Sequence, residues 1–111
     1  MTDRGKKLLT DVLTAIKLIE TFITGIKSFN DFKDDLKTQS AVERQLAIIG
    51  EAINKFDKLF PAFPLKHTGK IIAVRNRLIH AYDAIDNSII WAIIQNHPEG
   101  LKQEVVKRLS Q

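Results

Sequence analysis

The sequence predicts an all-α fold, an up-down bundle of four to five helices. Apolar residues recur along the chain in alternating steps of three and four, which is the spacing of one face of an α-helix. Three Pro and five Gly among 111 residues favour helices over a turn-rich β architecture. A hydrophobic content of 44% at this length suits one domain, residues 1–111, built around a single core.

The first helix is predicted over residues 5–27. Its apolar stripe consists of Leu9, Val12, Ile16, Ile19, Ile23 and Ile26. Gly25 weakens the last turn, and Ser28 followed by Asn30 and Asp31 indicates a break with a new cap. A short helical turn through Phe29 and Phe32 is expected to follow.

A second long helix follows, and Pro61 and Pro64 end it because proline cannot continue a helix. Its apolar stripe consists of Val42, Leu46, Ile49, Ile53, Phe56 and Phe60. Two long helices with matched stripes imply an antiparallel pair.

A third helix is predicted from about residue 66 to residue 80. A short polar connection, residues 81–86, separates it from a fourth helix that Asp86 or Asn87 caps. The fourth helix is interrupted at residues 96–98, and its pattern then continues to the end of the chain. On the third helix the inward positions are Ile71, Val74 and Leu78. The fourth helix is marked by Ile89, Ile90, Ile93 and Ile94, and its pattern continues through Leu101, Val105 and Leu109.

The composition narrows the classes of function. Without cysteine the chain has no disulfide, thiolate nucleophile or cysteine-based zinc site. No run of 18 apolar residues is present and no secretory signal opens the chain, so we expect a cytoplasmic protein without a membrane span. Seventeen Lys and Arg against thirteen Asp and Glu give a net charge of +4, which suits an anionic partner such as RNA.

Polar side chains crowd the end of the predicted third helix and the connection after it. They are Arg75, Asn76, Arg77, His80, Tyr82 and Asp83. Asn76 and His80 are four residues apart and share a helix face. Arg75 lies about 140° around the helix from His80, so its long side chain or a distorted last turn must bring the two together.

This set of side chains suits phosphodiester cleavage. His80 titrates near neutral pH and can take a proton from a ribose 2′-hydroxyl or give one to the leaving oxygen. Arg75 can bind the phosphate and its transition-state charge, and Asn76 can orient the imidazole or donate to a phosphate oxygen. Because one histidine cannot be base and acid in the same step, we expect a homodimer whose two motifs share a basic cleft.

Each of these residues also has a structural interpretation. Polar residues at a helix end often act as caps or surface hydrogen-bonders, and Tyr82 could pack the connection against the bundle. A lesser candidate group on the second helix consists of Glu43, Arg44, Gly50 and Glu51, where Gly50 would allow another helix backbone to approach closely. Their alternative is a solvated face or an ion pair with the arginines of the third helix.

No metal or cofactor is expected. His67 and His97 have no carboxylate partner at ligand spacing, and no pair of histidines has the spacing of a zinc motif. The sequence also lacks a glycine-rich phosphate loop and a G-x-S-x-G motif.

Two motifs on successive helices resemble those of a known family. The segment from Arg75 to Tyr82 reads R-N-x3-H-x-Y and resembles the R-x4-H-x-Y motif of HepT-like toxins in the HEPN superfamily. Residues 40–44 and 48–52 read S-A-V-E-R and I-I-G-E-A and are similar to the family's signature on the helix before. Asp86, Ile90 and Trp91 fall where the fourth helix of the family begins, so the resemblance covers nearly the whole chain.

The resemblance implies a HEPN-like bundle of four to five helices that forms a homodimer and cleaves RNA as a metal-independent endoribonuclease. It also implies a cognate minimal nucleotidyltransferase antitoxin, which in this family modifies the motif tyrosine, here Tyr82, with AMP. Adenylate beside His80 and Arg75 would repel an RNA phosphate.

The leading hypothesis is therefore an RNase toxin. His80 acts as general acid/base, Arg75 holds the phosphate, Asn76 orients the site and Tyr82 is the regulatory position. The supporting candidates are Glu43, Glu51, Arg77 and Asp83. Two alternatives stay open, a non-catalytic helical partner or nucleotide-binding module that pairs with a nucleotidyltransferase, and a structural homodimer.

Overall fold

The computed structural model describes residues 1–80, 86–96 and 98–111, with the backbone alone for residues 79 and 80. In this part of the chain the fold is all-helical, as the sequence predicts. The helices are α1 (Asp3–Phe22), α2 (Phe29–Lys33), α3 (Leu36–Leu59), α4 (Gly69–His80), α5 (Asn87–Asn96) and α6 (Pro98–Leu109). These six described helices exceed the predicted four to five because the turn at Phe29 forms a helix of its own and the last segment is divided before Pro98.

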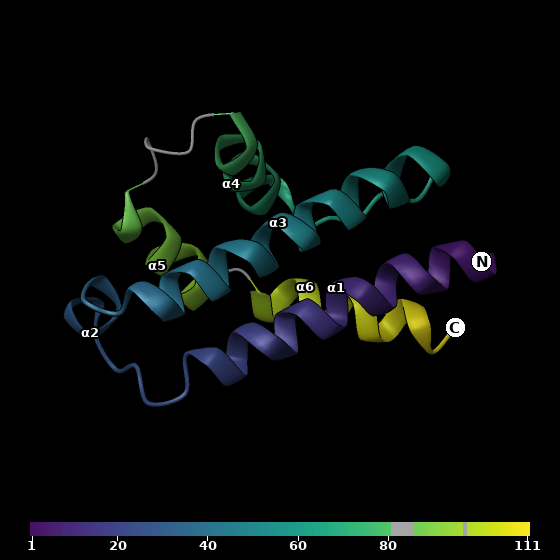
Figure 1. Ribbon diagram of the computed structural model, residues 1–111. Helices are drawn as coiled ribbons and strands as arrows, with labels where there is room; N and C mark the ends of the chain where they lie inside the picture. The colour runs from purple at the N-terminus through teal and green to yellow at the C-terminus, as the bar shows by residue number, and fades with distance from the viewer. Residues whose placement is uncertain (81–85, 97) are drawn as a thin grey trace.

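The long helices α1 and α3 run antiparallel and pack along most of their length, which confirms the predicted pair (Figure 1). Helix α6 lies along α1 and returns toward the end of the bundle where the chain starts. Lys102 of α6 pairs with Glu20 near the end of α1 at 3.0 Å, which fits this antiparallel arrangement. Helix α4 lies on the side of α3 opposite α1, and α5 packs against α2 (Figure 1).

The core consists of the predicted stripes. Its buried members include Leu9, Val12, Ile16, Ile19, Val42, Leu46, Ile49, Ile53, Phe56, Ile71, Val74, Ile90, Ile93, Ile94, Leu101 and Val105. Ile23, Ile26, Phe60, Leu78 and Leu109 are partly buried against them. Ile89, which helps to mark the fourth helix in the sequence, is exposed, because it lies in the first turn of α5, away from the packed face.

Two predicted helix boundaries are wrong, and each error has a local cause. Helix α1 ends at Phe22 and not at residue 27, since Gly25 has a φ of 88° and turns the chain out of the helix. Helix α4 begins at Gly69 and not at residue 66. The carboxylate of Glu104 accepts the backbone N–H of Lys66 at 3.1 Å and that of His67 at 3.4 Å, which holds both residues outside the helix.

Side chains cap the shorter helices. Ser28 accepts the N–H of Asp31 at 3.2 Å, so the new cap predicted at residues 28–31 is present and Ser28 provides it. Of the two candidates before α5, Asp86 is the cap, since its carboxylate accepts the N–H of Ser88 at 2.8 Å. The resulting hydrogen bonds hold the pKa of Asp86 below its usual value.

A buried amide joins α2, α3 and α5. Gln39 of α3 donates to the backbone oxygens of Phe32 and Lys33, at 2.7 and 2.8 Å, and so satisfies the C-terminal end of α2. Asn87 donates to the side-chain oxygen of Gln39 at 3.1 Å, which ties down the first residue of α5. This contact anchors the chain directly after the segment that carries Tyr82.

Within the described residues, no helix combines the length and the apolar character needed to cross a bilayer.

Candidate active site at the crossing of α3 and α4

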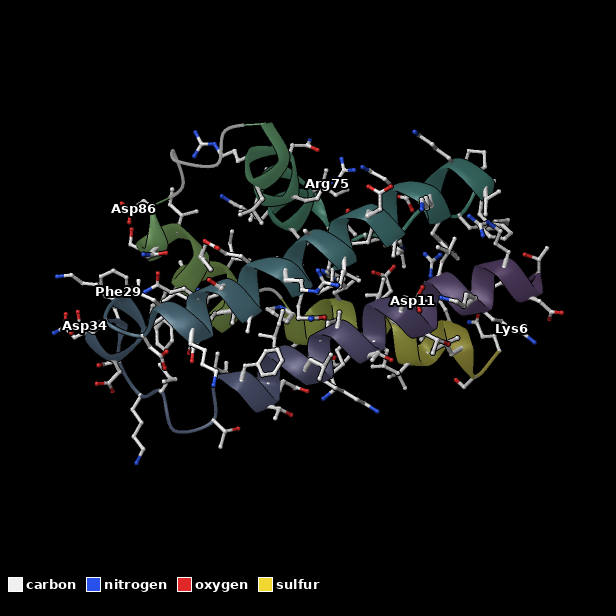
Figure 2. The ribbon with its side chains drawn as sticks, in the orientation of Figure 1. Lys6, Asp11, Phe29, Asp34, Arg75 and Asp86 are labelled. Carbon is white, nitrogen blue, oxygen red and sulfur yellow. The ribbon has the colours of Figure 1, made fainter. Side chains whose placement is uncertain are left out.

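Arg75 lies in the middle of α4, where that helix faces α3 (Figure 2). Its side chain packs over Gly50 of α3. A Cβ atom at position 50 would lie 2.6 Å from Cγ of Arg75, closer than two carbon atoms can approach. The close approach predicted at Gly50 is thus present. The group that approaches Gly50 is the side chain of Arg75 and not, as predicted, a helix backbone.

The neighbouring Glu51 holds the guanidinium. Its carboxylate accepts a hydrogen bond from Nη2 of Arg75 in an ion pair between α3 and α4. This confirms the interpretation of Glu51 as an ion-pair partner of an arginine on the third helix. Lys55 lies 3.7 Å from the other carboxylate oxygen, a contact that sequence reasoning did not name although the i, i+4 spacing of the two residues could have indicated it.

Arg75 is more buried than a surface arginine, because its side chain is only 18% exposed. Its Nη1 donates to the side-chain oxygen of the exposed Asn76 at 3.0 Å. Its Nε is buried and has no hydrogen-bond partner among the described residues. Glu51 and Asn76 thus hold the guanidinium in one orientation, and an anion would approach its Nη atoms because Nε is buried.

The other motif residues are only partly described. Arg77 is exposed on α4, and the backbone of His80 forms the last residue of that helix. Tyr82 and Asp83 lie outside the described residues, as does His97. The predicted meeting of His80 with Arg75 therefore stays a prediction.

Glu43 lies two turns before Gly50 on α3 and is half-buried. Burial raises the pKa of its carboxyl, since the charged form loses hydration there. It forms no ion pair with any described residue. Its role as a supporting residue stays a prediction.

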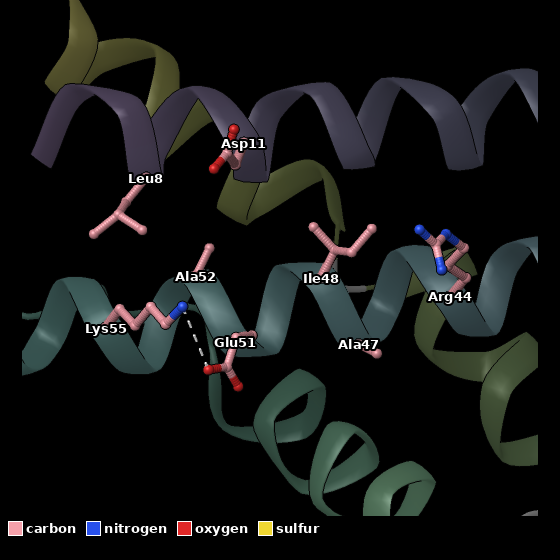
Figure 3. A pocket seen from close by; sticks show the side chains of 8 residues that line it. All are labelled: Leu8, Asp11, Arg44, Ala47, Ile48, Glu51, Ala52 and Lys55. Carbon is pink, nitrogen blue, oxygen red and sulfur yellow. Dashed lines mark ion pairs between the residues drawn. The ribbon is translucent and has the colours of Figure 1, made fainter. Parts of the chain in front are cut away.

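A groove of about 560 Å³ runs between α1 and α3 and reaches Glu51. Leu8 and Asp11 line it from α1, and Ile48 is its exposed apolar side chain on α3 (Figure 3). In the same view Glu51 points toward the α4 side of α3. Any molecule in this groove would therefore lie next to the residue that holds Arg75.

The net positive charge of the chain comes from the segment that contains this crossing. Residues 51–80, which comprise the end of α3, the connection and α4, contain six Lys and Arg and two Asp and Glu. The remaining residues contain eleven of each sign, so the whole net charge of +4 belongs to this segment. A polyanion would be attracted to α4 more than to any other helix.

Comparisons with known proteins point to one family. The family model described as "Ribonuclease HepT-like" matches residues 12–108. The "Probable ribonuclease HepT" of Thermococcus cleftensis is 40% identical over 106 residues, which cover 92% of this chain and 93% of the relative.

Two further relatives carry provisional RNase names. One, from Methanocaldococcus jannaschii, is 37% identical over 109 residues and covers 92% of this chain and 87% of its own. The other, from Caldanaerobacter subterraneus subsp. tengcongensis, is 37% identical over 97 residues and covers 86% of each chain. No solved structure matches the chain significantly.

Proposed function

Since the chain belongs to the HepT-like ribonuclease family, we propose that it is a metal-independent endoribonuclease that acts as the toxin of a toxin–antitoxin pair. The observation that carries this proposal is the Arg75 guanidinium, which Glu51 fixes over Gly50 within the most basic part of the chain. In this role Arg75 binds the scissile phosphate, and Asn76 orients the bound group.

The proposed reaction is an internal transesterification. A histidine base removes the proton of a ribose 2′-hydroxyl, and the 2′-oxygen attacks the adjacent phosphorus. The bond from phosphorus to the 5′-oxygen breaks, and a histidine acid protonates that oxygen. The products are a 2′,3′-cyclic phosphate and a 5′-hydroxyl. Arg75 stabilises the charge that develops on the phosphoryl oxygens.

Two copies of His80 supply the base and the acid, so the proposed active unit is a homodimer of the single domain 1–111. Both motifs then face one phosphate across the subunit boundary. Sedimentation at the assay concentration tests this point. A fully active monomer would overturn it.

The proposed partner is a minimal nucleotidyltransferase antitoxin that transfers AMP to Tyr82. The added adenylate would place negative charge beside the phosphate-binding Arg75 and block RNA. Incubation of the native chain and of Tyr82→Phe with the antitoxin and ATP tests it, since the mass of one AMP should appear on the native chain alone.

Cleavage of RNA in the presence of EDTA tests the main proposal. The native protein should cut RNA and leave 2′,3′-cyclic phosphate ends, and His80→Ala and Arg75→Ala should lose at least a hundredfold in rate. Arg4→Ala, an exposed arginine on α1, is the matched control and should cleave like the native protein.

Three results would contradict the proposal. If EDTA abolishes cleavage, the reaction depends on a metal. If His80→Ala cleaves like the native chain, the site is elsewhere. If no form cleaves RNA, the chain is better described as a non-catalytic partner of a nucleotidyltransferase.

A further inference from the structure

Phe63 is an aromatic side chain that the fold does not bury. It lies in the connection between α3 and α4 and is 72% exposed. Apolar side chains of this size usually find a place in the interior or at an interface. An exposed phenylalanine in a mobile loop would need no explanation. The exposure of Phe63 therefore indicates a binding surface only if the connection that carries it is rigid.

Hydrogen bonds fix the backbone at Phe63 and directly after it. Arg108 of α6 donates to the backbone oxygen of Phe63 at 2.5 Å and to that of Pro64 at 2.7 Å. The next residue, Leu65, is buried, and its N–H donates to Asp57 at 3.0 Å. Helices α3 and α6 therefore hold the connection, and the Phe63 ring is presented to solvent from a fixed backbone.

The ring borders a groove of about 870 Å³ between the connection and α6. Phe56 and Phe60 also line this groove, and their ring centroids are 4.8 Å apart. The groove thus has an aromatic wall on the side of α3.

The charged side chains of the groove are mostly basic. Lys66, Lys107 and Arg108 line it, as does His67. Glu104 is the single acidic side chain among its described lining residues, and it already binds Arg108 and the backbone of the connection. Lys66 and Lys107 form no ion pair with a described residue, so their charge is available to an anion.

We propose that this groove binds an unpaired nucleotide of single-stranded RNA, with its base stacked on Phe63 and its phosphate held by Lys66 and Lys107. Aromatic rings beside cationic side chains are the usual platform for an unpaired base and its backbone, and charge complementarity favours such a strand over an uncharged apolar partner. The groove is a second contact for the RNA, separate from Arg75.

The groove and Arg75 can engage one strand. Lys66 and His67 directly precede α4, and Gly69 and Arg75 are separated by six residues, about 9 Å of helix rise. Phe63, Lys66 and Arg75 lie within the segment 51–80 that carries the net charge, and Lys107 reaches the groove from α6. The identity of the ligand as RNA rests on the proposed function, whereas the location of the binding site rests on the groove alone.

Binding of a short, fluorescently labelled single-stranded RNA tests the inference. All variants carry His80→Ala, so that cleavage does not interfere. Phe63→Ala should weaken binding by about 5- to 150-fold, the range typical for loss of one stacked base, whereas Phe63→Tyr should bind within about twofold of the parent. Leu36→Ala is the matched control, because Leu36 is 74% exposed at the opposite end of α3 and should not affect binding.

Two further measurements identify the source of the effect. Lys66→Gln should reduce the slope of log Kd against log salt concentration by about one, as expected for one lost phosphate contact. An RNA that lacks bases should bind the Phe63→Ala and parent proteins equally, since it has nothing to stack.

Unchanged RNA affinity in a folded Phe63→Ala protein would overturn the inference. So would a change in the oligomeric state of Phe63→Ala without a change in affinity, because the groove would then be a protein interface. Phe63-dependent RNA binding by a chain that never cleaves RNA would refute the proposed nuclease and leave this groove standing. If cleavage depends on Arg75 and His80 but is unaffected by Phe63→Ala, the proposed nuclease is supported and the binding groove is refuted.

Discussion

The side chain of Arg75 on α4 lies directly on Gly50 of α3, so the two sequence motifs of this chain form one structural unit. Gly50 leaves the space that the aliphatic part of Arg75 fills, and Glu51 binds the guanidinium at its end. The I-I-G-E segment of one helix and the R-N segment of the next are therefore linked by packing as well as by charge.

Gly50→Ala should displace Arg75. The added Cβ would collide with the Cβ and Cγ atoms of Arg75, and a side chain packed between two helices has little room to move. We expect a loss of about 1–3 kcal/mol in the free energy of unfolding, measured by urea denaturation. RNA cleavage should fall at least tenfold, since the guanidinium no longer lies where Glu51 holds it.

Gly69→Ala provides the control for this substitution. A Cβ at Gly69 would have no described heavy atom within 4 Å, and the residue starts α4 on an exposed face. Its stability should be unchanged or slightly higher. Equal losses of stability in Gly50→Ala and Gly69→Ala would show that the contact with Arg75 is not the cause, because helix propensity alone favours alanine over glycine.

Glu51→Gln should impair catalysis more than folding. The variant keeps the shape of the side chain and removes the charge that fixes Arg75, so the maximal cleavage rate should fall about tenfold while the stability changes by about 1 kcal/mol. Single-turnover cleavage and urea denaturation measure the two effects.

Lys55→Met tests the contribution of Lys55 to cleavage separately from that of Arg75, the other ion-pair partner of Glu51. Lys55 pairs with Glu51 at 3.7 Å and is 51% exposed, and exposed pairs of this kind contribute little. Cleavage by Lys55→Met should stay within about twofold of the native rate. If Lys55→Met loses as much cleavage activity as Glu51→Gln, the effect of Glu51→Gln cannot be assigned to the Arg75–Glu51 pair in particular.

Glu43→Gln should stabilise the protein at neutral pH and not in acid. Because burial raises the pKa of Glu43 above 4.5, the folded protein keeps this proton to a higher pH than the unfolded chain does. Stability is therefore lost as the pH rises through the folded pKa, and a glutamine escapes that loss. The gain at pH 7 should be below about 1 kcal/mol, because the group is only half-buried.

The pH dependence of this gain is its decisive property. It should vanish well below pH 4.5, where the carboxyl is protonated in both states. Glu99→Gln on the exposed face of α6 is the control. A gain in Glu43→Gln that is independent of pH would point to a cause other than the buried charge.

Gln39→Met should cost about 1–3 kcal/mol in the free energy of unfolding, because it leaves the carbonyls at the end of α2 and the amide of Asn87 without their partner. Gln45→Met is matched to it, since Gln45 is also buried on α3 but makes no side-chain hydrogen bond to a described residue. Thermal unfolding of both compares them directly. Similar losses would assign the effect to packing and not to the network.

Local signals in the sequence predict most of the helices. The stripe from Leu9 to Ile19 and the one from Val42 to Phe56 are buried as expected, since helix periodicity alone sets which residues share a face. Ser28 and Asp86 act as caps through backbone contacts within three residues. The start of α4 was misplaced because Glu104, 38 residues from Lys66, decides it.

The sequence by itself determined the helical class, the antiparallel pairing of α1 with α3, and the residues that make up the motif, because all three depend on spacing along the chain. The tertiary structure alone decided that Arg75 packs on Gly50 and that Glu51, and not Glu43, binds the Arg75 guanidinium. It also decided that the Phe63 side chain is exposed on a fixed backbone. These relationships join residues more than twenty positions apart. They depend on how one helix lies across another, which the periodicity of a single helix does not specify.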